Sequence, residues 1–255
     1  MTDTSPTRVR LADVTKSFGA GPVLDRVGLD AAQGEFVALV GPSGAGKSTL
    51  LRLLNGMHAP DSGTVEVLGT DPAACSRRAL RTLRRDVGFV FQDFGLVGRL
   101  TALENVLMGA LATLRLPRYG VMTYPASLRA RAVENLERVG LVEHRFQRCD
   151  TLSGGQQQRV AIARTLMQDP RVILADEPVA SLDPATSVAV LDVLGRIAKE
   201  DGRTVLCSLH QVDLALQVAD RVVALRGGHK VLDRPAGELD EAAMRAVYAA
   251  EAGHG

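Results

Sequence analysis

The sequence predicts an α/β protein with a mostly parallel β-sheet, an antiparallel β flap near its N-terminus and an inserted α-helical subdomain. Short β-branched and apolar runs alternate with stretches of helical period, which is the pattern of strands joined by crossover helices. The runs expected to form strands are residues 9–14, 36–40, 87–91, 172–175, 204–208 and 222–225.

The flap and the subdomain are predicted where this alternation is interrupted. The first ~35 residues hold strand-like pieces with no helix between them and a Gly-rich turn at 19–22, as in an antiparallel hairpin. Between residues 101 and 150 the β-rich pattern stops, and residues 103–114 and 127–139 carry apolar side chains at three- and four-residue steps, as helices do.

These interruptions suggest a division of the chain. Residues 1–92 and 151–235 are expected to form the core with its flap, and residues 93–150 the helical subdomain, with a helix over 153–168 at its edge. Residues 117–125, rich in Pro, Gly and Tyr, are expected to form a loop, and residues 236–255 a peripheral helix or tail.

Composition excludes several classes of protein. With 255 residues, 46% hydrophobic and 23% charged, the chain can bury a sizeable core and is neither disordered nor fibrous. Its net charge of +1 supplies no overall field for nucleic acid, so we expect no nucleic-acid partner. Any anion must be held by a local site.

Cysteine usage and hydropathy predict a location. Cys75, Cys149 and Cys207 are scattered and lack the spacing of a disulfide framework or a zinc site, which favours the reducing cytoplasm. We find no secretory signal, and the longest apolar runs fall far short of the ~20 residues that cross a bilayer. If the protein acts on a membrane, another subunit must span it.

A phosphate-binding loop is the most specific motif. Residues 37–50 read as a buried strand, a Gly-rich loop matching G-x-x-x-x-G-K-[ST], and the first turn of a helix. Glycines let successive backbone N–H groups point at phosphate oxygens, and the helix N-terminus adds its positive end. The expected nucleotide-binding residues here are Gly41, Pro42, Ser43, Gly44, Ala45, Gly46, Lys47, Ser48 and Thr49.

Two side chains of this loop have distinct expected roles. Lys47 would neutralise the β- and γ-phosphates of ATP, and Ser48 would ligate Mg²⁺. The alternative is a Gly-rich strand-to-helix turn with a surface lysine. The strand and helix that flank the motif favour a P-loop NTPase core.

A pair of acids follows the apolar run at 172–175. Asp176 at the strand tip can hold Mg²⁺ through water, and Glu177 can orient or deprotonate the water that attacks the γ-phosphate. By themselves, two acids after a strand more often mark a solvated loop. Together with the phosphate loop, the functional roles of the two acids at Mg²⁺ and the γ-phosphate become the favoured interpretation.

Residues 152–159, LSGGQQQR, resemble the signature of ATP-binding-cassette (ABC) proteins and precede the acid pair as that family requires. Ser153 can cap the helix that follows, leaving Gly154, Gly155 and Gln156 at a tip with outward N–H groups. An ordinary capped helix is the alternative reading. The resemblance implies that this tip closes on ATP held by a second copy, so we expect a homodimer.

Other residues match landmarks of the family in order. Gln92 matches the glutamine that touches Mg²⁺ and senses the permease, and Asp183 the loop that communicates between the two ATP sites. His210 matches the switch histidine at the γ-phosphate, and Phe18 the aromatic that stacks on adenine. The resemblance thus implies catalytic roles for Glu177, His210, Lys47 and Gln92, and Mg²⁺ ligation by Ser48, Gln92 and Asp176.

Within the family, residues 177–184 (EPVASLDP) and 209–215 (LHQVDLA) are similar to the ATPases of phosphonate importers. Gly95 departs from this branch, where a polar Asn is expected, and residues 115–125 match it poorly. Phosphite or another small oxyanion therefore stays open as the substrate.

The resemblance implies that the chain works at the cytoplasmic face of a membrane. Its expected partners are permease subunits and, indirectly, a substrate-binding protein. The apolar loop 94–100 is a candidate dock for a permease helix, or else packs inside the subdomain. A cassette that regulates a membrane complex without transport, and a scaffold without turnover, are the rival functions. A cassette acting on DNA or ribosomes is disfavoured, because we find neither a coiled coil, a second cassette nor a basic stripe.

Overall fold

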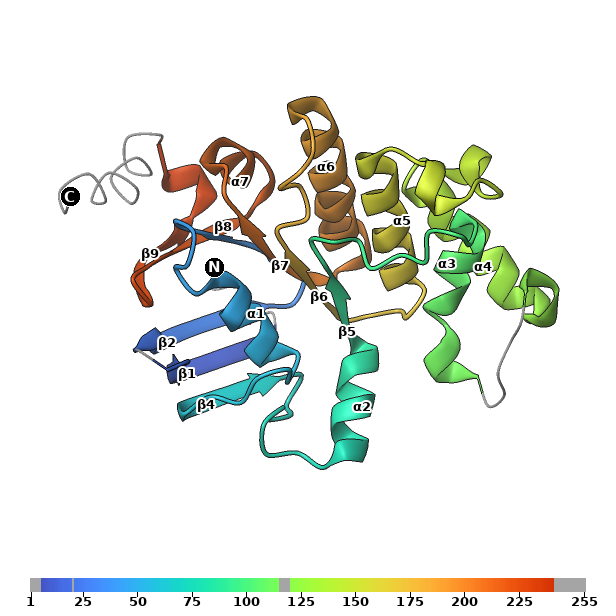
Figure 1. The fold of residues 1–255 in the computed structure, drawn as a ribbon. Coiled ribbons are helices and arrows are strands. Elements are labelled where there is room, and N and C mark those ends of the chain that lie inside the picture. Colours follow the sequence, from blue (N-terminus) through green and yellow to red (C-terminus); the bar gives the residue numbers. More distant parts are fainter. Residues whose placement is uncertain (1–5, 20, 115–119, 241–255) are drawn as a thin grey trace.

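The structure is a computed structural model that describes residues 6–19, 21–114 and 120–240. A six-stranded core sheet runs in the order β5-β6-β7-β3-β8-β9 (Figure 1). Its strands are β5 (Val87–Val90), β6 (Val172–Asp176), β7 (Thr204–Leu209), β3 (Phe36–Val40), β8 (Arg221–Arg226) and β9 (His229–Pro235). The first five are parallel, and β9 pairs antiparallel with β8. The predicted α/β class is confirmed.

Strand β9 was not predicted from the sequence. It is mostly exposed and has no run of buried apolar residues, so its hydrophobic pattern does not mark it as a strand. It follows β8 through Gly227 and Gly228, which both have positive φ, as tight hairpin turns require. Backbone pairing to the edge of the sheet, and not burial, makes it a strand.

The flap is a separate three-stranded antiparallel sheet in the order β2-β1-β4. Its strands are β1 (Thr7–Ser17), β2 (Pro22–Ala32) and β4 (Ser62–Val67). The hairpin of β1 and β2 is as predicted. The third strand comes from beyond α1 (Lys47–Leu54), so the flap also draws on a segment that the sequence did not assign to it.

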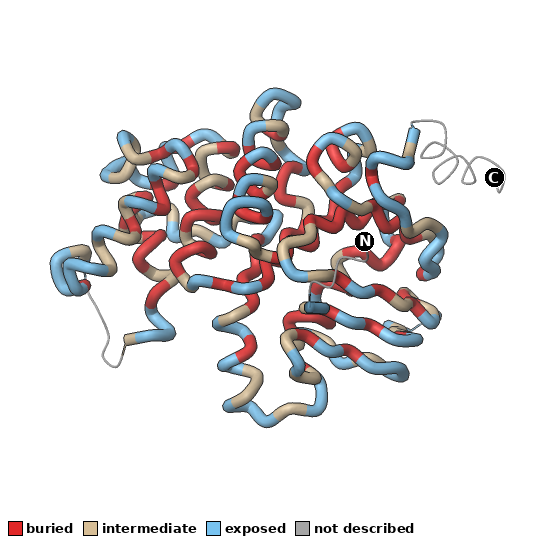
Figure 2. The backbone as a smooth tube through the Cα atoms, turned by 180° about the vertical axis from the view of Figure 1, so that it is seen from behind, coloured by how far each residue is buried: buried red, intermediate tan, exposed pale blue. Residues whose placement is uncertain are grey.

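The core sheet separates two hydrophobic clusters, because alternate residues of each strand face opposite sides. In β3, Val37 and Leu39 face the flap-side core, which also holds Leu50 and Leu54 of α1. Phe36, Ala38 and Val40 face the helix-side core, which also holds residues of α3, α4, α5, α6 and α7. Figure 2 shows the buried backbone running through both layers.

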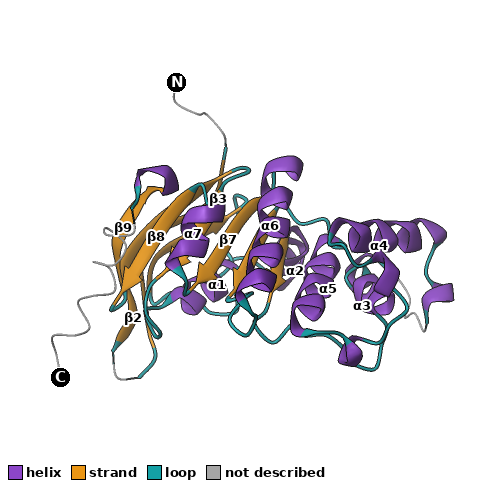
Figure 3. Cartoon of the chain, turned by 90° about the horizontal axis from the view of Figure 1, so that it is seen from above, coloured by secondary structure: helices purple, strands orange, loops and turns teal. Residues whose placement is uncertain are grey.

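The helices have the following bounds: α1 (Lys47–Leu54), α2 (Arg77–Asp86), α3 (Ala102–Met108), α4 (Ala126–Arg138), α5 (Gly154–Leu166), α6 (Pro184–Asp201) and α7 (Val212–Val218). Helices α3, α4 and α5 pack on one another and lie together beside the core sheet (Figure 3). Helices α3 and α4 lie within residues 93–150, the stretch predicted to be a helical subdomain, and α5 corresponds to the helix predicted at its edge. The proposed boundaries of the subdomain stay a prediction. None of the described helices has the length and apolar character needed to span a bilayer.

Three segments differ from the prediction or lie partly outside the described residues. The helix expected over 103–114 ends at Met108 and continues as a 3-10 turn at Leu111–Thr113. A Cβ on Gly109 would lie 2.2 Å from the Arg164 carbonyl oxygen, so the chain passes close to α5 there. Of the expected loop 117–125, residues 117–119 lie outside the described residues, and Val121–Thr123 forms a 3-10 turn. The C-terminal helix expected within 236–255 falls mostly on residues 241–255, which also lie outside them; Ala236–Glu238 is a 3-10 turn.

Candidate nucleotide site

The Gly-rich loop between β3 and α1 has two positions that only glycine fits. Gly41 and Gly46 have φ values of 143° and 100°. A Cβ on Gly41 would lie 2.1 Å from the Leu225 carbonyl oxygen, and one on Gly46 2.7 Å from the Val23 carbonyl oxygen. Gly44 also has positive φ, but no atom lies within 4 Å of its Cβ position. The loop is therefore packed against β8 and β2 on one side and open at Gly44.

Lys47 lies inside this loop. Its side chain is buried, and its Nζ donates hydrogen bonds to the carbonyl oxygens of Gly41 at 2.7 Å and Pro42 at 3.0 Å. Burial lowers the pKa of Lys47, and the nearby carboxylates of Glu177 and Asp176 oppose that shift. A cation is thus held where the loop would enclose phosphate oxygens.

Asp176, the last residue of β6, joins the loop to the neighbouring strands. Its Oδ1 accepts hydrogen bonds from Ser48 Oγ at 2.7 Å and Ser208 Oγ at 3.0 Å. Arg52 Nη2 lies 3.7 Å from the other carboxylate oxygen. A hydroxyl and a carboxylate at this position are the oxygen ligands that Mg²⁺ prefers, so the pair fits that ion.

Glu177 and His210, predicted from separate motifs, meet in the structure. His210 Nε2 lies 2.7 Å from Glu177 Oε1. Glu177 has a φ of 48°, which is uncommon for a residue other than glycine. Its backbone N–H donates a hydrogen bond to Ser208 Oγ at 2.8 Å. The acid is therefore held in a turn at the carboxyl end of the parallel strands.

Ser208 and Arg52 are two residues of this site that the sequence analysis missed. Ser208 is a fully buried polar residue at the end of an apolar strand, and β6–β7 pairing places it directly beside Asp176. That polar interruption was the available signal. The sequence gives no comparable signal for Arg52, because a charged residue in a helix usually lies on the solvent-exposed face.

Gln92 and Phe18 lie at the surface. Gln92 is exposed two residues beyond β5, which is the neighbour of β6 in the sheet. The described side-chain hydrogen bonds do not join it to Ser48 or Asp176. The Phe18 ring is 49% exposed and makes an edge contact with the His58 ring, with centroids 5.1 Å apart. Lys16 Nζ also lies over the Phe18 ring, 5.3 Å from its centroid, so the exposed ring already has a cation beside it.

The tip at 153–156 begins α5. Ser153 Oγ accepts a hydrogen bond from the Gln156 N–H, and the Gln156 side chain accepts one from the Ser153 N–H, which completes a capping box. A Cβ on Gly155 would lie 2.0 Å from Thr186 Cγ2, so α5 and α6 approach closely there. Asp183 caps α6 by accepting from the Thr186 N–H. Hydrogen bonding to the Thr186 side chain, and then to its backbone N–H, lowers the pKa of Asp183.

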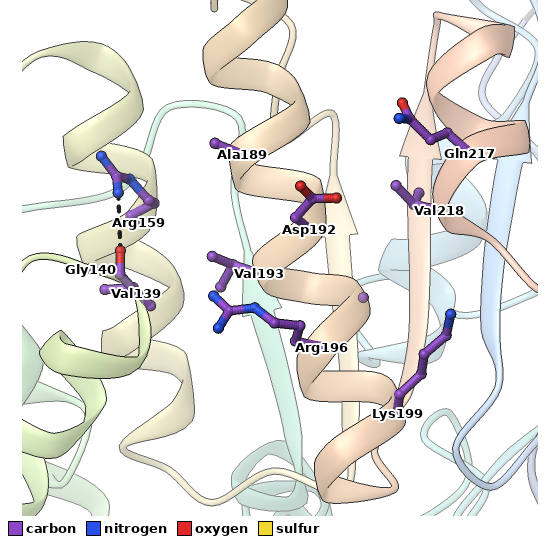
Figure 4. Close-up of a pocket in the computed structure, with 11 residues that line it drawn as sticks. Val139, Gly140, Arg159, Ala189, Asp192, Val193, Arg196, Lys199, Gln217 and Val218 are labelled. Carbon is purple, nitrogen blue, oxygen red and sulfur yellow. Dashed lines mark hydrogen bonds between the residues drawn. The ribbon is translucent and has the colours of Figure 1, made fainter.

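The tip and the phosphate loop do not form one site within a chain. Residues of α1 belong to the flap-side core and residues of α5 to the helix-side core, so the two helices lie on opposite faces of the sheet (Figure 1). A hollow of about 540 Å³ over α5, α6 and α7 is also separate, since it shares no residue with the loop (Figure 4). There Arg159 donates to the Val139 carbonyl oxygen and ties α5 to the end of α4.

A glycine cradle with an enclosed lysine, followed by a serine hydroxyl that meets a strand-end carboxylate, defines a P-loop nucleotide hydrolase. Residues 24–180 match the ABC transporter family. The chain belongs to this family and is an ABC ATPase.

Individual relatives cover nearly the whole chain. The Nocardia farcinica protein named phosphonates import ATP-binding protein PhnC is 59% identical over 92% of this chain and 88% of its own. The Mycolicibacterium smegmatis protein named phosphate-import ATP-binding protein PhnC is 60% identical over 92% of this chain and 90% of its own.

Solved structures agree with the fold. The dimeric post-hydrolysis state of the ATP-binding cassette MJ0796 with ADP and Pi has a TM-score of 0.78 and 36% identity, covering 89% of this chain and 98% of that one. The ADP conformation of the cassette MJ1267 has a TM-score of 0.84 and 25% identity, covering 98% of this chain and 100% of that one.

Proposed function

We propose that this ABC ATPase drives an importer of phosphonate or a related phosphorus oxyanion, working as a pair of identical chains on a separate permease. The observation that carries the energy-coupling role is the cluster of Ser48, Asp176, Glu177 and His210 beside the open glycine loop. The proposed place of action is the cytoplasmic face of the membrane. A substrate-binding protein would be an indirect partner.

The arrangement of this cluster supports a distinct role for each residue in ATP hydrolysis. The open loop and Lys47 would hold the β- and γ-phosphates, and the exposed Phe18 ring would stack on adenine. Ser48, Asp176 and Gln92 would hold Mg²⁺, which when bound offsets the charge of the phosphates. Glu177 would position and deprotonate the attacking water, and His210 would hold Glu177 and contact the γ-phosphate.

Two chains are proposed because one chain presents its loop and its tip on opposite faces of the sheet. In an antiparallel pair, the Ser153–Gln156 tip of each chain could close on the ATP held by the other, with Asp183 at the contact. The MJ0796 cassette, which is 36% identical, is dimeric in its ADP and Pi state. Binding two nucleotides would then close the pair and move the permease.

The loop 94–100 is proposed as the permease dock. Arg164 of α5 donates hydrogen bonds to the carbonyl oxygens of Phe94 and Gly95, and Asn105 donates to those of Val97 and Leu100. Val97 is 41% exposed. The loop is thus rigidly held yet presents an apolar side chain outward, which suits a docking surface better than a buried core segment.

The departure at Gly95 does not weaken this proposal. Gly95 has a φ of 61°, in the left-handed region that glycine adopts freely and asparagine tolerates. Gly in place of the expected Asn therefore preserves the shape of the loop.

The substrate class rests on the relatives. One relative of 59% identity is named for phosphonates and one of 60% for phosphate, so phosphate is a second candidate. Both are small phosphorus oxyanions, as phosphite is. With the permease and binding protein in vesicles, we expect ATP-driven uptake of labelled phosphonate, and competition by phosphate and phosphite would rank the three. ATPase activity that responds to none of them would favour a regulator of a membrane complex.

The role of Glu177 is tested by Glu177→Gln. The amide keeps the shape of the side chain but removes the base, so we expect ATP binding to persist and turnover to fall by at least ~10²-fold. The trapped pair should elute as a dimer with MgATP in gel filtration. Normal phosphate release by this variant would show that Glu177 is not the base.

A further inference from the structure

We propose that Ser208 is a positioning residue for ATP hydrolysis, because its one hydroxyl fixes both Asp176 and Glu177. The inference rests on the roles proposed above for these two acids. Ser208 itself would touch neither ATP nor water. It would act by fixing the position of Asp176, the proposed metal ligand, relative to Glu177, the proposed base.

The position of Ser208 follows from the sheet. In the parallel pairing of β6 with β7, Asp176 and Ser208 are register partners. Ser208 is fully buried, and its Oγ donates to Asp176 Oδ1 at 3.0 Å while accepting from the Glu177 N–H at 2.8 Å. A serine hydroxyl has one proton and two lone pairs, so both hydrogen bonds can exist at once.

The second bond matters because Glu177 is in an unfavourable backbone conformation. A φ of 48° costs free energy in a residue with a Cβ, and such a residue stays there only when its surroundings hold it. This turn brings Glu177 Oε1 to 2.7 Å from His210 Nε2. The Ser208 hydroxyl is therefore well placed to keep the carboxylate of Glu177 facing His210.

The first bond has a separate effect on Asp176. Asp176 Oδ1 accepts from both Ser48 and Ser208, one from each flank. The Ser208 bond fixes the carboxylate without help from the phosphate loop. Asp176 would then stay oriented when Ser48 turns its hydroxyl oxygen toward a metal ion.

The test compares Ser208→Ala with Cys207→Ala. Both remove one heavy atom from a fully buried position in β7, but Cys207 belongs to the helix-side core, and its only described hydrogen bond is a weak one to a backbone carbonyl. We expect Ser208→Ala to lower kcat about tenfold or more with the KM for ATP changed less than about twofold. Cys207→Ala should keep the wild-type kcat, and Ser208→Thr, which keeps a hydroxyl, should recover part of the loss.

A readout without nucleotide separates positioning from general damage. In the nucleotide-free protein, the Glu177 amide proton should exchange with solvent about tenfold faster in Ser208→Ala than in Cys207→Ala. If Ser208→Ala does not fold, Ser208→Cys keeps a similar shape with a much weaker hydrogen-bonding group and should show the same losses. Wild-type kcat, or unchanged Glu177 exchange, would overturn the inference. Glu177→Gln keeps the two hypotheses apart: if it stops turnover while Ser208→Ala does not, only the role of Ser208 fails.

Discussion

The N-termini of α1 and α5 are both glycine-rich, yet only that of α5 is capped by a side chain. Helix α1 begins after Gly46, which is in a left-handed conformation and offers no side-chain cap. Helix α5 begins after Ser153, whose side chain forms a capping box with Gln156. The N-terminus of α1 therefore presents backbone N–H groups beside a buried lysine, whereas that of α5 is capped by the side chains of Ser153 and Gln156.

This difference predicts that the N-terminus of α1 is a complete anion-binding site, whereas that of α5 supplies only part of one. The first-turn N–H groups of a helix need acceptors, and an uncapped end with a cation beside it is suited to phosphate. A capping box already supplies acceptors to part of the first turn. The α1 end should therefore bind ATP in a single chain, whereas the α5 end should contribute only when a second chain brings nucleotide to it.

The largest expected effect is that of Lys47→Ala, which removes the cation from the α1 end. ATP affinity should weaken by about 2–5 kcal/mol, because the bound phosphates would lose the buried positive charge that neutralises them. Fluorescent-nucleotide titration of dilute, monomeric protein measures this. The tip variant Ser153→Ala should bind ATP normally in the same assay. If both variants lose affinity equally, the two helix ends are not the distinct sites proposed here.

A smaller effect is expected where α5 meets α6. Gly155→Ala would place a methyl group 2.0 Å from Thr186 Cγ2, and such overpacking should cost about 1–3 kcal/mol in the free energy of unfolding. Gly195→Ala is the matched control: it lies in α6, has no atom within 4 Å of its Cβ position, and should stabilise by up to about 1 kcal/mol. Urea unfolding compares them. Equal stability of the two variants would refute the close approach.

The smallest effect is that of Ser153→Ala on folding. Loss of this cap should lower the free energy of unfolding by about 1 kcal/mol, since one helix N-terminus loses its side-chain acceptor. Ser153→Asp retains an acceptor and should restore most of that stability. Thermal unfolding measures both. A larger loss than that of Gly155→Ala would mean that Ser153 supports more than the end of α5.

The contrast between the two ends could be read only partly from the sequence. The glycine loop and the capping serine stand in short contiguous motifs, because their backbone geometry is local. No short sequence motif predicts the contact between Gly155 and Thr186, because it depends on how α5 and α6 cross. The same holds for the contact of Glu177 with His210, which are 33 positions apart in the chain and directly follow the neighbouring strands β6 and β7.

By itself, the sequence determined the α/β class, the buried strands of the core sheet, and the glycine loop and acid pair of the nucleotide site. These follow from periodicity and from motifs whose chemistry is confined to a few consecutive residues. Only the tertiary structure decided that β4 joins the flap, that β9 closes the edge of the core sheet, and that Ser208 lies between Asp176 and Glu177. Strand pairing and register bring together residues that are distant in the chain, and no local pattern of side chains encodes that proximity.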